Sequence, residues 1–127
     1  MSKHETPLTL RYWSEVGGTL VEEFLVVPAS GTCAKRLLDG LILPNGPNER
    51  VSSNEVEIAG QDVIVVQTKA KRLGMYLLGQ AVFSAELIKR HNPKSVRTVA
   101  ICTEGDSALE PLARDYGVEI VVYPAEY

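Results

Sequence analysis

Apolar residues form an almost uninterrupted run near the middle of the chain, at residues 62–69 (DVIVVQTK). The run is rich in Val and Ile and contains no Gly or Pro, which is typical of a buried central strand. Because successive strand side chains point to opposite faces, we expect four residues to share one face: Val63, Val65, Gln67 and Lys69. The polar pair at the end of this face indicates either a site or an ordinary strand end that reaches water.

The same pattern predicts the other elements of the chain. Four further apolar runs are typical of strands: 19–27, 37–43, 96–102 and 118–123. Three stretches predict helices: one that opens near Pro7 and ends at Gly17, one over 71–90 where apolar residues recur about every fourth position, and one over 107–116.

The order of these elements is helix, three strands, helix, strand, helix, strand, which predicts an α/β domain with a mixed sheet. The first three strands are close enough for antiparallel pairing, and the later helices are long enough to serve as crossovers to parallel strands. A chain of 127 residues corresponds to one domain. We expect residues 1–6 to be disordered and the polar segment 44–62 to protrude as a hairpin arm.

Composition limits the classes of function. The net charge is −3 and no strongly basic stripe is present, which argues against a high-affinity DNA-coating protein but leaves room for an enzyme with a local basic rim. No stretch is long enough to span a bilayer, and the N-terminus lacks a secretion pattern. Cys33 and Cys102 match no metal or redox spacing, so we expect reduced thiols in a cytoplasmic protein.

A candidate site combines two of the predicted strands. Asp39 lies within the second strand, and Gln67 and Lys69 end the third. If these strands are neighbours, a carboxylate, an amide and an ammonium converge. The two oxygen ligands suit Mg²⁺, and the ammonium can orient water or neutralise charge on a phosphate. The alternative is that Asp39-Gly40 forms a hairpin turn, in which case Asp39 lies at a turn and the site does not exist.

This arrangement resembles the PD-(D/E)XK phosphodiesterase superfamily, whose members share the restriction-endonuclease-like fold. The resemblance covers residues 8–102 as an αβββαβ core, with 107–123 as a further helix and strand, and its motif is short. It implies that Asp39 ligates a metal ion, that Lys69 is the catalytic lysine, and that Gln67 occupies the position usually held by Glu or Asp. Leu38 stands where many members have Pro. The neutral Gln67, known from the family's helicase-linked branch, leaves the site one negative charge short.

The resemblance also implies an activity: metal-dependent endo- or exonucleolytic hydrolysis of DNA, with Mg²⁺ or Mn²⁺ as cofactor. Family members often add an acidic residue near the N-terminus, for which the candidates are Glu15, Glu22 and Glu23. Four basic residues are expected to contact flanking phosphates: Lys35, Arg36, Lys71 and Arg72.

A domain of this size offers little surface for duplex recognition, so we expect a homodimer, with a protein partner as a further expectation. The second hypothesis is a catalytically inactive module with the nuclease fold that binds nucleic acid or another protein. The neutral Gln67 and the acidic net charge support it.

Overall fold

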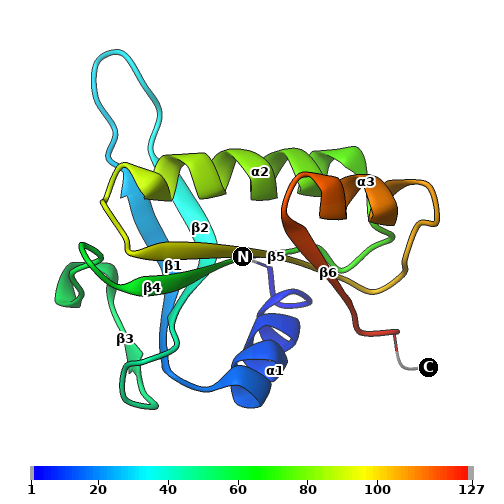
Figure 1. Cartoon of the computed structure of the whole chain (residues 1–127), viewed down its shortest axis with the longest axis horizontal. Helices are drawn as coiled ribbons and strands as arrows, with labels where there is room; N and C mark the ends of the chain where they lie inside the picture. The colour runs from blue at the N-terminus through cyan, green and yellow to red at the C-terminus, as the bar shows by residue number, and fades with distance from the viewer. Residues whose placement is uncertain (1, 126–127) are drawn as a thin grey trace.

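One six-stranded mixed sheet organises the protein, with the strand order β3-β1-β2-β4-β5-β6 (Figure 1). The computed structural model describes residues 2–125. The strands are β1 (Thr19–Val27), β2 (Arg36–Leu43), β3 (Arg50–Val51), β4 (Asp62–Thr68), β5 (Ser95–Cys102) and β6 (Val118–Val122). The helices are α1 (Thr6–Val16), α2 (Met75–Lys89) and α3 (Leu109–Asp115).

Strand pairing follows the prediction for an α/β domain with a mixed sheet. β1 pairs with β2, and β2 with β4, in antiparallel ladders. β4, β5 and β6 are parallel, with α2 and α3 as the crossovers between them. The C-terminal end of β4 and the N-terminal end of β2 therefore lie at the same end of the sheet, which is where the candidate residues occur.

Helices cover the sheet on both sides: α1 lies on one face, and α2 and α3 lie on the other (Figure 1). The central strand β4 is buried by both layers, and its residues 63–66 are at most 1% exposed. Val63 and Val65 pack in the cluster that contains Ile88 of α2, whereas Ile64 and Val66 pack with Tyr12 of α1. Each such side chain contributes about 1.5–3 kcal/mol by leaving water, so this run anchors the fold.

The alternation of side chains is interrupted at one place in both β1 and β2. Val21 and Phe24 belong to the cluster on the α2 side, and so do Leu38 and Leu41, although residues three apart in a regular strand face opposite ways. Between each pair lies the residue that breaks the pattern: Glu23, with a φ of 52°, in β1, and Asp39 in β2. This irregularity sets the direction of the Asp39 side chain.

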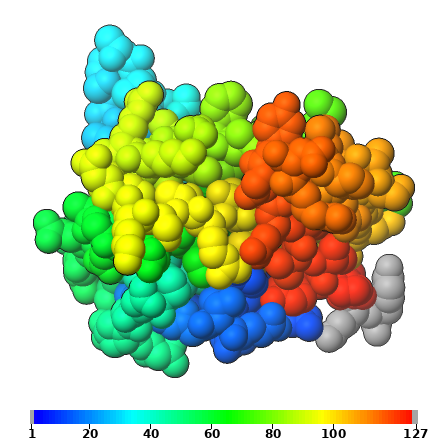
Figure 2. Space-filling model, viewed as in Figure 1, coloured from blue at the N-terminus to red at the C-terminus, as the bar shows by residue number. Residues whose placement is uncertain are grey.

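The segment 44–62 does not protrude as the hairpin arm that we expected. It carries the short strand β3, which pairs in parallel with β1 at the sheet edge, and its Ile58 is buried in the core cluster on the α2 side. Burial of Ile58, with Val56 packed against the same cluster, holds the segment down. The loop that projects is the β1–β2 connection at 28–35, whose residues are exposed (Figures 1 and 2).

The residues before α1 form a turn, and neither cysteine is in a disulfide. Residues 2–5 form a hydrogen-bonded turn in which Ser2 O accepts from Glu5 N at 3.1 Å, while Met1 of the segment expected to be disordered lies outside the described residues. Cys33 is exposed, Cys102 is buried, and both are free thiols. Within residues 2–125, each helix is too short or too polar to cross a lipid bilayer.

Candidate functional site

The neighbouring strands β2 and β4 part at the point where the candidate residues lie. Their antiparallel ladder ends at the pair Gly40 and Val66. Beyond this pair the Asp39 side chain bonds to the backbone of β4: its Oδ2 accepts a hydrogen bond from the Thr68 N–H at 2.9 Å. Because β2 runs unbroken through residues 36–43, Asp39 is within a strand, and the alternative of a hairpin turn at Asp39-Gly40 is wrong.

A second carboxylate, that of Glu5, reaches the same chain segment from α1. Glu5 precedes the first turn of α1, and its Oε2 lies 3.8 Å from Lys69 Nζ. The Ala70 backbone N–H also acts to lower the pKa of this carboxyl. The side chain of Glu5 is 14% exposed, whereas that of Lys69 is 41% exposed. Two acidic groups therefore converge on residues 68–70, beside one ammonium that reaches solvent.

The threonine hydroxyls below this cluster fix the position of α1. Thr9 of α1 and Thr68 of β4 are buried, and their Oγ1 atoms lie 2.8 Å apart, within hydrogen-bond distance. Gly40 allows the approach, since a side chain there would bring a Cβ 3.2 Å from the Thr9 methyl carbon. The close contact of α1 with β2 and β4 is what brings Glu5 to the end of the sheet.

Burial is the main cause of the pKa shift at Asp39, and neighbouring groups modify it. Burial raises the pKa of the Asp39 carboxyl, the Thr68 N–H opposes this shift, and the charges of Glu5 and Glu23 add to it. Burial also acts to raise the pKa of Glu5. Hydrogen bonds from Ser2 and the Lys69 ammonium outweigh that effect, so the pKa of Glu5 lies below its usual value. A nearby cation would stabilise the ionised form of a buried carboxylate that has other carboxylates around it.

Gln67 does not share a face with Lys69, contrary to the prediction from strand alternation. Its Nε2 donates to Ser84 Oγ of α2 at 2.8 Å, and the residue is 3% exposed. Lys69 instead turns to Glu5 on the α1 side. β4 ends at Thr68, so the alternation that orders residues 62–68 does not extend to Lys69.

The Gln67 amide lies at a groove of about 360 Å³ between the start of β2 and α2. Ser84 and Gln80 of α2 contribute polar groups, and Arg36 and Phe83 are exposed members of the lining. The groove is thus on the α2 side of the sheet, whereas Glu5 and Lys69 meet on the α1 side. The amide is committed to Ser84 rather than to the carboxylate of Asp39.

The three N-terminal acids predicted as candidates have different surroundings. Glu15 accepts a hydrogen bond from Tyr123 Oη at 2.6 Å and pairs with Arg11; it lies at the far end of α1 from Glu5, about 15 Å away at 1.5 Å per residue. Glu22 forms an ion pair with Arg50. Of the three, Glu23 is the one whose charge acts on Asp39.

The four basic residues expected to contact phosphates are all exposed and flank the gap between β2 and β4. Lys35 precedes β2 and Arg36 begins it, while Lys71 and Arg72 follow β4, so antiparallel pairing places both pairs at one end of the sheet. Arg72 forms an ion pair with Glu104. Together with Lys69, these residues form a local basic rim on a protein of negative net charge.

The donor set at this end of the sheet suits a hard cation held by few protein ligands. Within residues 2–125, the structure contains no cluster of three or more His, Cys, Asp or Glu side chains arranged to hold a metal ion. Mg²⁺ is commonly bound by one or two carboxylates and keeps several waters. Asp39 and Glu5 supply two such carboxylates, and a cation beside Asp39 would favour its ionised form, which burial disfavours.

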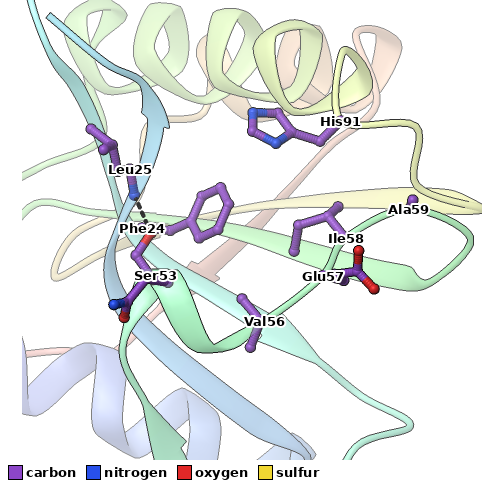
Figure 3. A pocket seen from close by; sticks show the side chains of 9 residues that line it. Phe24, Leu25, Ser53, Val56, Glu57, Ile58, Ala59 and His91 are labelled. Carbon is purple, nitrogen blue, oxygen red and sulfur yellow. Dashed lines mark hydrogen bonds between the residues drawn. The ribbon is translucent and has the colours of Figure 1, made fainter.

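A larger hollow, of about 420 Å³, lies where 53–59 packs beside β1 (Figure 3). Its polar groups serve the fold: Ser53 Oγ accepts from Leu25 N at 2.8 Å, and His91 Nε2 donates to Val26 O at 2.9 Å. The His91 ring also packs edge-on against Phe24, with centroids 5.7 Å apart. We therefore assign this hollow to packing and not to chemistry.

Sequence reasoning did not identify three residues that build the site: Glu5, Thr9 and Ser84. Glu5 and Thr9 lie on one side of α1, four residues apart, which is the spacing of neighbours on a helix surface. Ser84 lies on the apolar side of α2 between Ala81 and Ile88, where a buried hydroxyl requires a partner. The spacing of these residues was visible in the sequence, but the residues at and after the end of β4 that they contact were not.

Comparisons with protein-family models, curated proteins and solved structures give no match to this chain.

Proposed function

We propose that this protein is a metal-dependent phosphodiesterase that hydrolyses DNA. The observation that carries the proposal is the convergence of Asp39 and Glu5 on residues 68–70, beside the solvent-exposed Lys69. Two carboxylates can hold a metal ion and an ammonium can neutralise charge on a phosphate, which are roles used in metal-dependent phosphodiester hydrolysis. The proposed fold is restriction-endonuclease-like, supported by the order of α1, three antiparallel strands, α2 and the parallel strand β5.

Each residue has a role in this proposal. Asp39 and Glu5 would hold Mg²⁺ or Mn²⁺, which supplies Lewis acidity toward the phosphate and the attacking water. Lys69 would exchange its contact with Glu5 for the phosphate and neutralise the charge that develops on it. The basic rim of Lys35, Arg36, Lys71 and Arg72 would position the DNA backbone without reading its sequence.

The proposal is tested by cleavage of linear, nicked, forked and four-way DNA in the presence of Mg²⁺ or Mn²⁺. Asp39→Asn and Lys69→Met preserve side-chain size and are expected to abolish metal-dependent cleavage, and Glu5→Gln is expected to reduce it by about 10²-fold or more, as for loss of a charged group at a catalytic centre. Absence of cleavage by the wild-type protein on all four substrates would contradict the proposal.

A matched control is Asp62→Asn, because Asp62 begins the same strand and is bound by Asn45 and Ser95 at the opposite end of β4. This variant should retain the wild-type cleavage rate. Binding of Mg²⁺ can be followed independently by titration calorimetry, in which Asp39→Asn should remove the signal and Asp62→Asn should not.

A second function is favoured by the position of Gln67, whose amide nitrogen donates to Ser84 on the α2 side of the sheet, away from the contact between Glu5 and Lys69. In that case the protein is a non-catalytic module that binds nucleic acid through the basic rim. It would bind DNA in a salt-dependent manner, would not cleave it, and would lose affinity in Arg36→Ala and Lys71→Ala but not in Asp39→Asn.

A further inference from the structure

The outer surface of α2 and α3 carries most of the large apolar side chains that the described residues expose. The following five are between 48% and 78% exposed: Met75, Tyr76, Phe83, Leu112 and Tyr116. Four of them line a groove of about 310 Å³ between the two helices, completed by Leu78, Gly79, Val82 and other uncharged residues. Monomeric proteins rarely expose contiguous apolar patches of more than a few hundred square ångströms, so this face indicates an interface.

Gly79 lies between Met75 and Phe83 on this face. Met75, Gly79 and Phe83 follow one another at intervals of four residues and therefore form a stripe along α2. A Cβ at Gly79 would meet nothing within 4 Å, so packing within one chain does not require glycine there. Glycine inside a helix costs about 1 kcal/mol relative to alanine, and close approach of a second backbone from outside explains its presence.

We propose that a second copy of this chain covers the face, with the two α2 helices antiparallel about a two-fold axis at Gly79. In this arrangement Gly79 faces its counterpart, and Phe83 of each copy enters the apolar groove that Met75 lines in the other copy. An isologous interface uses the same surface of both copies, so that surface must be complementary to itself. Here each copy offers both the inserted side chain, Phe83, and the groove that receives it. The proposal does not depend on nuclease activity, since Asp39, Glu5 and Lys69 take no part in it.

The exposed apolar area matches what a stable dimer buries. Three aromatic residues are about 70% exposed, and whole aromatic side chains bury about 150–250 Å² each, so each offers on the order of 100–150 Å². With Met75 and Leu112 included, one copy presents on the order of 500–600 Å² of apolar area, against about 800 Å² of total area per partner in a standard interface. Polar atoms at the rim supply the remainder in such interfaces.

Sedimentation equilibrium of the full chain between about 1 and 100 μM tests the proposal, since this range brackets micromolar dimer affinities. The wild-type protein is expected to be dimeric, and Phe83→Glu and Tyr116→Glu to be monomeric with unchanged far-UV circular dichroism. Val16→Glu is the matched control: Val16 is also an exposed apolar residue at a helix end, but on α1, and this variant should remain dimeric.

Cysteine cross-linking locates the axis. In a Cys33→Ser background, Gly79→Cys is expected to form a covalent dimer on mild oxidation, because a disulfide requires Cα atoms about 4.4–6.8 Å apart. Ser14→Cys, exposed on the opposite side of the sheet, should remain uncross-linked. A monomeric wild-type chain would overturn the proposal and leave a different protein as the occupant. A dimer that survives Phe83→Glu would overturn it as well, and so would a Gly79→Cys protein that sediments as a dimer but does not cross-link.

Discussion

The amide nitrogen of Gln67 lies 2.8 Å from the hydroxyl oxygen of Ser84, and this bond ties the end of β4 to α2. Both residues are at most 8% exposed, in the lining of the groove between β2 and α2. The next residue but one, Lys69, turns the other way to Glu5. The open end of β4 is thus shared between two helices, with a structural hydrogen bond on one side and a charged cluster on the other.

Ser84→Ala should destabilise the protein by about 1–3 kcal/mol, because it leaves the buried Gln67 amide without its acceptor. Urea denaturation followed by circular dichroism measures the change. The control is Ser14→Ala, an exposed serine in α1, in which the same gain of helix propensity occurs without loss of a buried partner. If both variants had equal stability, Gln67 would have to possess another partner in the mutant.

Asp39→Asn should stabilise the protein at pH 7. The pKa of Asp39 is raised in the folded state, chiefly by burial, so wild-type stability falls as pH rises through that folded pKa. Asn keeps an oxygen that can accept from the Thr68 N–H but carries no charge. The expected rise in Tm is on the order of a few degrees at pH 7 and disappears near pH 3, below the unfolded pKa of about 3.9.

Asp62→Asn should change the stability of the protein in the opposite direction from Asp39→Asn under the same conditions. Hydrogen bonds from Ser95 and Asn45 lower the pKa of Asp62, so its ionised form stabilises the fold at neutral pH. Calorimetric scans should therefore show a higher Tm for Asp39→Asn and a lower Tm for Asp62→Asn at pH 7. Neither change should be present at pH 3. A loss in both variants would contradict the assignment of Asp39 as a crowded, partly buried acid.

Glu5→Gln should lower stability at pH 7 by roughly 0.5–1 kcal/mol, a modest figure because the partner Lys69 is screened by solvent. Burial opposes ionisation of Glu5, but Ser2 and Lys69 outweigh it, and the net pKa is lowered. Its stabilising effect is therefore present above the unfolded pKa of about 4.3 and is lost as pH falls through the lower folded pKa. Denaturation at pH 7 and pH 3 checks this, with Glu86→Gln on the exposed surface of α2 expected to change little.

Gly40→Val should destabilise the protein by about 1–3 kcal/mol through overpacking. A Cβ at Gly40 lies 3.2 Å from the Thr9 methyl carbon and 3.5 Å from Val66 Cβ, so the branched side chain must push α1 away from the sheet. Because α1 carries Glu5, metal-dependent cleavage should fall as well. Gly31→Val is the control, since a Cβ there meets nothing within 4 Å, and thermal unfolding should separate the two variants.

Local pattern was sufficient for the main elements of the fold. The apolar run in β4, the four-residue period in α2 and the short apolar runs of the other strands predicted their positions to within a few residues. The segment 44–62 was the exception, because its weak alternation gave no indication that Ile58 would be buried and that β3 would pair in parallel with β1.

The sequence by itself determined which residues could form strands and helices, because those features depend on neighbours along the chain. The pairing of β2 with β4, a tertiary contact, placed Asp39 beside the end of β4. Only the tertiary structure decided that Gln67 faces Ser84, that Lys69 faces Glu5, and that Asp39 leaves the regular alternation opposite Glu23. Side-chain direction at a strand end is set by contacts with helices many residues away, and no periodicity within the strand encodes those contacts.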